Sequence, residues 1–492
     1  MSAPRVRPRH ARLALLFCGL LATCSRPAAD APPDVYLIVV DTLRADRLGC
    51  YGHELPTSPF LDGLAAEGTV FLDNTSQSSW TKPSMVSLMS GTYVTSFRDV
   101  MPDDVPSLAQ TFQQAGYHTI GIVANILLSP KLGFDRGFDY YDARENTEEE
   151  LADLEARGII VTPCREIEAM RAELDRLLDE EFARRDAGAH RPIFAYLHPM
   201  EPHDPYEDHP RFAEALPLEG VPTRLPSEWH RAEVESLSRS PESAESKDEW
   251  RIMNAHRGFY EREVRATDEA LRVFFDRLRA AGRLDNAVIA VVSDHGEGLY
   301  EPLAMLRPAA RDKAPLVRVF QQGHGRNLNA CLVRTPFLLH GAGVPKGVRV
   351  DDPVENVDLY PTLVALCGIE PTGTTQGRSL VDLMHGSADE WKRDLHSFTL
   401  FATSIRERST GLKLTLVSHA GRKLSAVPGL YDTVADPDER VNLYDERPDD
   451  VARLQQKIEL WQAAFPMESS DPASADPEQL RHMRALGYIG ND

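Results

Sequence analysis

Mostly apolar runs of six or seven residues recur along the chain, and stretches of helical length separate them. Runs without polar alternation are typical of strands that are buried on both faces of a parallel sheet. The sequence therefore predicts an α/β fold in which a large, mostly parallel sheet has helices on both faces. The predicted strands cover 35–40, 118–124, 192–198, 287–293 and 336–341, and the predicted helices include 164–185 and 260–282.

The alternation of strands and helices ends near residue 385, where short strand-like pieces and turn residues replace it. Residues 34–385 are expected to form the main α/β domain, and residues 386–465 a small C-terminal α+β subdomain. We interpret residues 466–492 as a linker and a C-terminal tail. The polar, charge-rich stretch 207–258 is interpreted as an insertion over the strand ends.

The first 24 residues have the pattern of an export signal. An Arg-rich start precedes the apolar run LALLFCGLLAT, which is too short to span a bilayer as a stable helix. The segment LATC (21–24) resembles a bacterial lipobox, so a lipid on Cys24 is expected to anchor the protein to a membrane. Simple signal cleavage is the alternative, at a small-residue site that ends at Ala31 and precedes Pro32. The protein is expected in the bacterial cell envelope, either periplasmic or as an anchored lipoprotein.

The net charge of the 492-residue chain is −21, which argues against nucleic acid as a partner. The sequence indicates no particular oligomeric state. Four cysteines follow the export signal, and their spacing lacks the close pairs of a zinc site. They could form up to two disulfides or remain unpaired buried thiols. These residues are Cys50, Cys164, Cys331 and Cys367.

Polar metal-ligand residues follow two of the predicted strands. Asp294 and His295 come directly after the strand 287–293, and Asp41 follows the strand 35–40. The carboxyl ends of parallel strands gather ligands at one edge of the sheet, so these three side chains are expected to meet. Carboxylates with an imidazole suit a divalent metal ion.

Thr81 lies at a predicted helix start, since Pro83 suits the first turn of a helix and Thr81 suits its cap. Its hydroxyl would then lie where the helix dipole favours negative charge, as an attacking alkoxide requires. Capping alone is the alternative role for this residue.

Three histidines are further candidates for the same pocket. His198 ends the strand 192–198, His203 follows it closely, and His324 lies between two glycines. Single histidines are also common as structural or surface residues. Their positions at strand exits favour a role in proton transfer to or from a bound ester.

An ordered set of motifs resembles the sulfatase family of the alkaline phosphatase superfamily. The resemblance runs from about residue 34 to residue 490, and the order of the motifs makes it specific. The segments that carry it include DVYLIVVDTLRADRLGCYG (34–52), TKPSMVSLMSG (81–91), YLHPMEPHDPY (196–206), SDHGEGL (293–299), GHGRNL (323–328) and RALGYIG (484–490).

This resemblance implies one divalent metal ion, held by Asp41, Thr81, Asp294 and His295, with Thr81 as the nucleophile. His203 or His324 would then protonate the leaving alcohol. The metal would be Mn²⁺, Zn²⁺, Mg²⁺ or Ca²⁺. A nitrogen-tolerant ion is favoured, because His295 and Thr42 stand where calcium-type sulfatases usually have Asn and Asp.

The sequence also departs from the family pattern. Sulfatases that use formylglycine carry Cys or Ser in a C/S-x-P-S-R segment, whereas this chain has Thr81 and Met85 at its two ends. Threonine does not become formylglycine, which predicts a Thr-nucleophile subgroup. Arg44 or Lys82 could replace the lost arginine as an anion contact. The family's Lys-x-His substrate contact has no clear counterpart near 122–125, and a second metal would depend on Glu201.

We therefore hypothesise a metal-dependent hydrolase that cleaves sulfate or phosphate (di)esters through Thr81. The ester could be linked to a glycan or a lipid, and the choice among sulfate, phosphate and phosphonate stays open. One alternative is transfer of a phospho-alcohol head group within the cell envelope. Another is a catalytically silent family member that binds an anionic glycan.

Overall fold

A mixed eight-stranded sheet forms the centre of the computed structural model, with the strand order β11-β2-β10-β7-β1-β6-β4-β5. The structure describes residues 31–93, 101–102, 104–147, 149, 152, 164–218, 247–302, 320–387, 391–418 and 428–465. The predicted export signal with Cys24, and the predicted tail, lie outside these residues. The strands of this sheet are β1 (Asp34–Val40), β2 (Thr69–Phe71), β4 (His118–Val123), β5 (Tyr140–Asp142), β6 (Ile193–His198), β7 (Ala287–Ser293), β10 (Phe337–Gly341) and β11 (Val348–Val350).

The sheet is mostly parallel, as the sequence predicts. β1 pairs in parallel with β6 on one side and β7 on the other, and β4 continues the parallel series beside β6. β10 is the exception, because it runs antiparallel to both β7 and β2. The parallel strands β4, β6, β1 and β7 therefore bring their carboxyl ends to one edge of the sheet.

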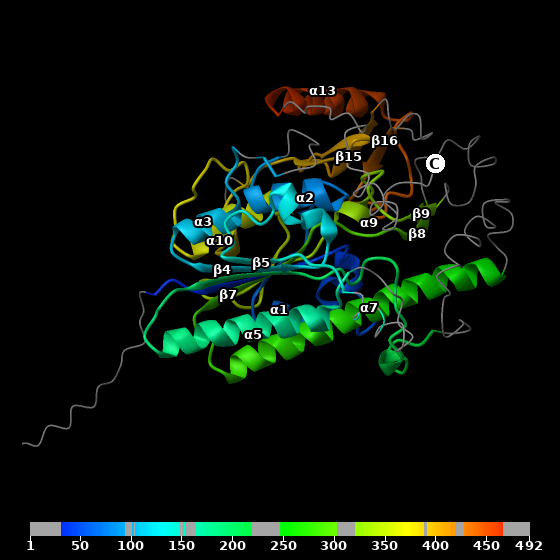
Figure 1. Cartoon of the computed structure of the whole chain (residues 1–492). Coiled ribbons are helices and arrows are strands. Elements are labelled where there is room, and N and C mark those ends of the chain that lie inside the picture. The colour runs from blue at the N-terminus through cyan, green and yellow to red at the C-terminus, as the bar shows by residue number, and fades with distance from the viewer. Residues whose placement is uncertain are drawn as a thin grey trace, which may run out of the picture. The chain divides into compact units, whose positions relative to one another are not determined.

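Helices cover both faces of the sheet (Figure 1). Side chains of β1 alternate between two hydrophobic clusters, with Val35 and Leu37 in one and Tyr36 and Ile38 in the other. This burial on both faces explains why β1 is apolar without alternation. α2 (Thr81–Ser90), α3 (Leu108–Gln114) and α10 (Leu359–Leu366) contribute to the first cluster, and α1 (Pro59–Ala66), α5 (Ile167–Asp186) and α7 (Lys247–Ala280) to the second.

A second sheet lies near the C-terminus and is antiparallel, with the order β13-β14-β15-β16. Its strands are β13 (Leu395–Phe398), β14 (Ala402–Arg406), β15 (Leu412–Val417) and β16 (Gly429–Asp432). α13 (Pro448–Ala464) packs Leu454 and Ile458 against Leu414 and Leu430 of this sheet. The predicted small C-terminal sheet is confirmed, while the domain boundary near residue 385 stays a prediction. The shorter elements are β3 (Asn74–Thr75), β8 (Leu299–Pro302), β9 (Phe320–Gln322), β12 (Val354–Glu355), α9 (Ala330–Val333) and α11 (Val381–Met384).

The structure corrects one expectation about the stretch 207–258. Its last part is not an insertion, because α7 begins at Lys247 and runs without a break to Ala280. Ala255, Phe259 and Tyr260 are buried at helical spacing. The many charges of this stretch gave it the composition of a polar loop.

Two further features of the described ranges concern disulfides and membrane-crossing helices. No disulfide involves any of the four cysteines of the described ranges, so the disulfide alternative is wrong for Cys50, Cys164, Cys331 and Cys367. Within the same ranges, none of the helices combines the length and the apolar character that a membrane crossing requires.

Candidate active site

Asp41, Asp294 and His295 form a buried cradle at the carboxyl edge of the main sheet. Asp41 follows β1 and Asp294 follows the neighbouring β7, so strand pairing brings them together. One ligand atom from each of the three residues lies within 4.8 Å of the other two, and all three residues are fully buried. His295 Nε2 lies 3.3 Å from Asp294 Oδ2 and 3.9 Å from Asp41 Oδ1.

The donor atoms of this cradle fit a divalent cation. Asp41 Oδ1 and Asp294 Oδ2 are buried and have no hydrogen-bond partner. Buried carboxylate oxygens normally carry partners, because desolvation of an unpaired charge is costly. Two oxygens and one imidazole nitrogen are a donor set that Mn²⁺ and Zn²⁺ accept. Within the described residues this is the single cluster of at least three such ligands.

A backbone contact fixes the tautomer of His295. Its Nδ1 lies 2.9 Å from the carbonyl oxygen of Gly296 and donates to it, so Nε2 carries the lone pair that faces the carboxylates. Burial lowers the pKa of His295, against the opposing effect of Asp294, and so favours the neutral imidazole. A side chain at Gly296 would clash, since its Cβ would lie 2.1 Å from the carbonyl oxygen of Cys331.

The two carboxylates of the cradle repel one another. Burial and the charge of Asp41 raise the pKa of Asp294 to about 7. The pKa of Asp41 is lowered although burial opposes this, because the hydrogen bond from His198 and the nearby histidines favour its ionised form. A cation between these carboxylates would relieve their repulsion.

Thr81 lies beside the cradle, at the first residue of α2. Its Oγ1 is 3.2 Å from His295 Nε2, and the residue is fully buried. The predicted cap position is wrong by one residue, because Trp80 occupies the N-cap and Thr81 is already helical. The backbone at Trp80 is extended, and the Trp80 side chain makes no capping hydrogen bond. The Thr81 hydroxyl still lies at the positive end of the helix dipole.

The loop after β1 is strained and is held by α7. Thr42 has φ 54°, which is unusual for a β-branched residue. Its backbone N–H donates to Asp294 Oδ1 at 3.2 Å. The Tyr260 hydroxyl donates to the Thr42 carbonyl at 2.8 Å and accepts from the Arg44 N–H at 2.9 Å. The strain is therefore stabilised by contacts that fix Asp41 relative to Asp294.

Arg44 and Lys82, the suggested replacements for the family arginine, are both nearly buried. The Arg44 guanidinium donates to Asp46 at 2.7 Å and to the carbonyl oxygen of Glu297 at 2.9 Å. It thus joins the loops that follow β1 and β7, and its role as an anion contact stays a prediction. Lys82 Nζ lies 5.5 Å from the centre of the Trp80 ring.

The three candidate histidines all lie around the cradle. His198 Nε2 is 3.3 Å from Asp41 Oδ2, and its Nδ1 is 2.9 Å from the Tyr196 hydroxyl. The His324 ring centre lies 4.5 Å from that of His295 and 5.0 Å from that of His203. A series of imidazoles therefore leads from the cradle through His324 to His203.

Sequence reasoning missed two buried residues that the fold brings here. Asn125, two residues after β4, lies 2.7 Å from Asp41 Oδ2, and its position at the shared sheet edge was the available signal. Glu297 Oε2 lies 3.0 Å from His324 Nδ1, and only its place two residues after His295 could have indicated it. Burial would raise the pKa of Glu297, but His324 and His203 lower it.

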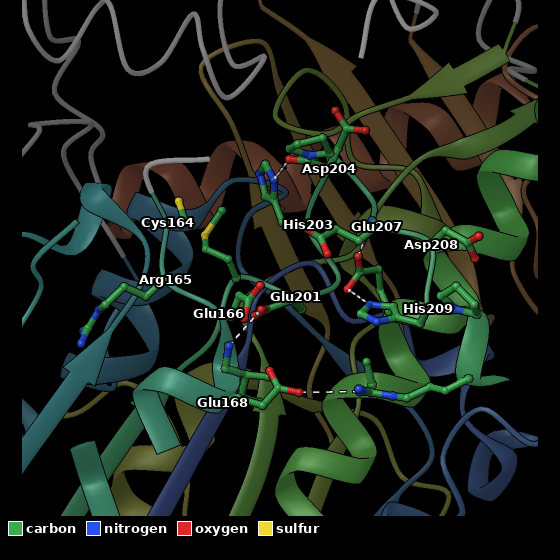
Figure 2. Close-up of a pocket in the computed structure, with 17 residues that line it drawn as sticks. Cys164, Arg165, Glu166, Glu168, Glu201, His203, Asp204, Glu207, Asp208 and His209 are labelled. Carbon is green, nitrogen blue, oxygen red and sulfur yellow. Dashed lines mark hydrogen bonds and ion pairs between the residues drawn. The ribbon is translucent and has the colours of Figure 1, made fainter. Parts of the chain in front are cut away.

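A cavity of about 570 Å³ opens beside His203 (Figure 2). Its size is within the range of pockets that bind small molecules. Glu201 faces this cavity and accepts the Ile167 N–H at 2.9 Å, at the start of α5, so it is not part of the metal cradle. The carboxylates around the cavity belong to Glu166, Glu168, Glu201, Asp204, Glu207, Asp208 and Glu263.

Comparison with known proteins gives consistent matches. A family profile described as Sulfatase matches residues 33–369, and one described as N-sulphoglucosamine sulphohydrolase, C-terminal, matches residues 326–464. The chain is 24% identical over 469 residues to the Ulvan-active sulfatase of Formosa agariphila, which covers 90% of this chain and 84% of that protein.

Two solved structures have a similar fold. The phosphonate monoester hydrolase of Agrobacterium radiobacter superposes with a TM-score of 0.62 at 19% identity, covering 88% of this chain and 96% of that one. A protein solved with its substrate D-glucosamine-2-N,6-O-disulfate gives a TM-score of 0.63 at 17% identity, covering 91% of this chain and 100% of that one.

The fold and the cradle define an α/β protein with a candidate metal site at the carboxyl edge of its main sheet. The chain belongs to the sulfatase family, because the family profile extends over more than half of its length.

Proposed function

We propose that this protein is a metal-dependent hydrolase of sulfate or phosphate (di)esters in which Thr81 is the nucleophile. The observation that carries the proposal is the position of Thr81 Oγ1, 3.2 Å from His295 Nε2 at the edge of the cradle. Thr81 is the first residue of α2 and not its N-cap, so its hydroxyl lies at the positive end of the helix dipole, beside the cradle.

In the first step, the Thr81 hydroxyl gives its proton to solvent, and Oγ1 attacks the sulfur or phosphorus atom in line while the bond to the alcohol oxygen breaks. His203 or His324 gives its proton to that oxygen, so that the alcohol leaves neutral. In the second step, water attacks the sulfur or phosphorus of the threonyl ester. The bond to Thr81 Oγ1 breaks, the water returns one proton to the histidine, and Oγ1 takes a proton from solvent. The product is sulfate from a sulfate ester, phosphate from a phosphate monoester and a phosphate monoester from a phosphodiester.

Asp41, Asp294, His295 and Thr81 would hold the metal ion. A bound divalent cation supplies positive charge that favours the deprotonated hydroxyl and neutralises developing oxyanions. The protein's own contribution is to hold the ligands: Thr42 and Tyr260 fix the loop of Asp41, and the Gly296 carbonyl orients His295.

Threonine favours phosphoryl over sulfuryl transfer. A formylglycine hemiacetal can release sulfate by its own collapse, whereas a threonyl ester needs water to attack the central atom. Phosphodiesters and phosphonate monoesters are suited to that route. The names of the relatives also point to sulfated glycans, so both kinds of ester belong in the test. The cavity beside His203 is of a size to accept the alcohol portion of such a substrate.

The test measures hydrolysis of an aryl sulfate, a phosphate monoester, a phosphodiester and a phosphonate monoester, with Mn²⁺ or Zn²⁺ and with a chelator. Wild-type protein is expected to cleave at least one of them in a chelator-sensitive reaction. Thr81→Ala should abolish turnover, while Thr81→Ser should keep part of it.

Thr362→Ala is the matched control, because Thr362 is equally buried. Its hydroxyl donates to the carbonyl oxygen of Asp358, the residue just before α10. Turnover retained by Thr81→Ala would exclude Thr81 as the nucleophile. A dominant chelator-sensitive sulfatase activity would overturn the preference for phosphoryl groups.

We also propose export to the cell envelope with a lipid anchor at Cys24, on the basis of the Arg-rich start, the apolar run and the LATC segment. Mass spectrometry of the mature N-terminus in a bacterial host tests this. A lipid on Cys24 is expected, and an unmodified N-terminus beyond residue 24 would contradict the anchor.

A further inference from the structure

Asn125 is a fully buried amide that contacts both Asp41 and Thr81. Its Nδ2 lies 2.7 Å from Asp41 Oδ2 and 3.4 Å from Thr81 Oγ1. It reaches them because it follows β4, whose carboxyl end lies at the same sheet edge as that of β1. One neutral side chain thus touches a carboxylate of the cradle and the proposed nucleophile.

A backbone group fixes the orientation of this amide. The Leu127 N–H lies 2.9 Å from Asn125 Oδ1. Because a backbone N–H can only donate, the atom that it meets must be the amide oxygen. The amide nitrogen therefore faces Asp41 and Thr81, and its two N–H groups are available to these two residues.

The contact with Asp41 distinguishes the two oxygens of that carboxylate. Oδ2 accepts from Asn125 and lies 3.3 Å from His198 Nε2. Oδ1 has no hydrogen-bond partner and lies 3.9 Å from His295 Nε2, inside the cradle. Asn125 and His198 thus occupy one oxygen and leave the other as a single metal ligand. Outer partners of this kind commonly fix the orientation of metal ligands.

The contact with Thr81 is longer than a usual N–H···O hydrogen bond, at 3.4 Å. Hydrogen bonds in catalytic sites often tighten only when substrate binds or charge develops. When the Thr81 hydroxyl loses its proton, its oxygen becomes a stronger acceptor for the Asn125 N–H. The bond would therefore favour the attacking form of Thr81 over the resting hydroxyl.

We propose that Asn125 is a further site residue with two roles. It selects Oδ1 of Asp41 as the metal ligand, and it donates a hydrogen bond to the attacking oxygen of Thr81. The first role concerns metal binding and needs no reaction. The second rests on the proposed function. Asn125 also lies in the stretch 122–125, where the family's cationic substrate contact is missing, so this part of the site carries a neutral donor.

The first test measures binding of Mn²⁺ alone by isothermal titration calorimetry. Asn125→Leu removes both N–H groups and keeps a similar volume, and Asn125→Ala removes the side chain. The Kd for Mn²⁺ is expected to rise about 10- to 100-fold in both variants. Asn74→Leu is the matched control, because Asn74 is equally buried but donates to Thr335 and Asn356. Thermal unfolding of each protein confirms that the variants fold.

A second test measures kcat and KM at saturating Mn²⁺ on the best ester of the four. Asn125→Leu is expected to lower kcat roughly 100-fold with little change in KM, as for other donors that act on developing charge. An unchanged Mn²⁺ Kd in folded Asn125 variants would overturn the first role, and an unchanged kcat would overturn the second. If wild-type protein cleaves none of the esters but Asn125→Leu still weakens Mn²⁺ binding, the hydrolase function fails and the first role stands.

Discussion

Two pairs of fully buried acids in this protein are stabilised in different ways. Glu355 and Asp358 share the guanidinium of Arg393, whose Nη1 lies 2.6 Å from Asp358 and whose Nη2 pairs with Glu355. Asp41 and Asp294 instead face imidazoles and amides, and each keeps one oxygen without a hydrogen-bond partner. Burial of charge is costly in both regions. The first pair shares one cation of the protein itself, and burial raises the pKa of Asp358 well above its usual range. The second pair has imidazole partners and keeps two oxygens without a hydrogen-bond partner, as a cation site would.

This difference separates a structural charge cluster from a functional one. Both have acids next to strand ends, and both are inaccessible to solvent. The arginine partner of the first pair and the two unpartnered oxygens of the second distinguish them. Changes to the second pair should therefore affect activity more than stability, and changes to the first pair should do the reverse.

The largest expected effect is that of Asp294→Asn. The variant removes one ligand charge, so Mn²⁺ binding should be lost and turnover should fall roughly 1,000-fold or more. The Tm measured with chelator should not fall, because the substitution also removes the repulsion between Asp294 and Asp41. Calorimetric titration and thermal scans check this. A Tm several degrees below wild type would mean that the acid pair stabilises the fold.

Arg393→Met should show the opposite pattern. It leaves Glu355 and Asp358 buried without their cation, which costs about 3–5 kcal/mol in the free energy of unfolding. Urea unfolding measures this loss. Lys346→Met is the control, because its ion pair with Glu67 is exposed and contributes only about 0–1 kcal/mol. Unchanged stability of Arg393→Met would remove the distinction between the two acid pairs.

Glu297 is an intermediate case, since it is buried like both pairs and its partner is His324. Glu297→Gln keeps an acceptor for His324 but loses the charge that orients and supports the imidazole. Turnover should fall roughly 10- to 100-fold for esters with poorly leaving alcohols, because these depend most on proton donation. The loss should be smaller for a nitrophenyl ester. An equal loss for both kinds of ester would indicate a merely structural role.

The smallest effect is expected at Glu407, a paired acid of the C-terminal sheet. Burial opposes its ionisation, but Lys457, Thr410 and Arg453 lower its pKa to about 2. Because the folded pKa is below the unfolded one, the stabilisation is complete above about pH 4.5 and is lost as the pH falls toward 2. The contribution of ionised Glu407 to the free energy of unfolding is roughly 1–2 kcal/mol, because Arg453 and Lys457 are partly exposed and solvent screens their charges.

Glu407→Gln should therefore reduce the dependence of stability on pH between about 4.5 and 2. Urea unfolding at several pH values tests the slope. If wild type and variant keep parallel curves over this range, the Glu407 cluster does not contribute to acid stability.

The local chain pattern predicted much of the fold. Apolar runs identified β1, β4, β6, β7 and β10 within one or two residues, because strands buried on both faces need apolar side chains at every position. The start of α2 was placed one residue late, since capping is decided by backbone angles at Trp80. The charged start of α7 was taken for a loop, because a helix rich in charged residues has a composition similar to that of a polar loop.

The sequence by itself determined the α/β class, the family resemblance and the candidate metal ligands Asp41, Asp294 and His295, because each depends on short-range pattern or on ordered motifs. Tertiary structure alone decided which oxygens of the two carboxylates stay without partners. It also brought Asn125 to Asp41, across 84 residues, and Asp294 to Thr42, across 252 residues. The physical reason is that strand order places the carboxyl ends of β4, β6, β1 and β7 at one edge of the sheet. Hydrogen bonds between residues at that edge cannot be predicted from the local pattern of apolar and polar residues.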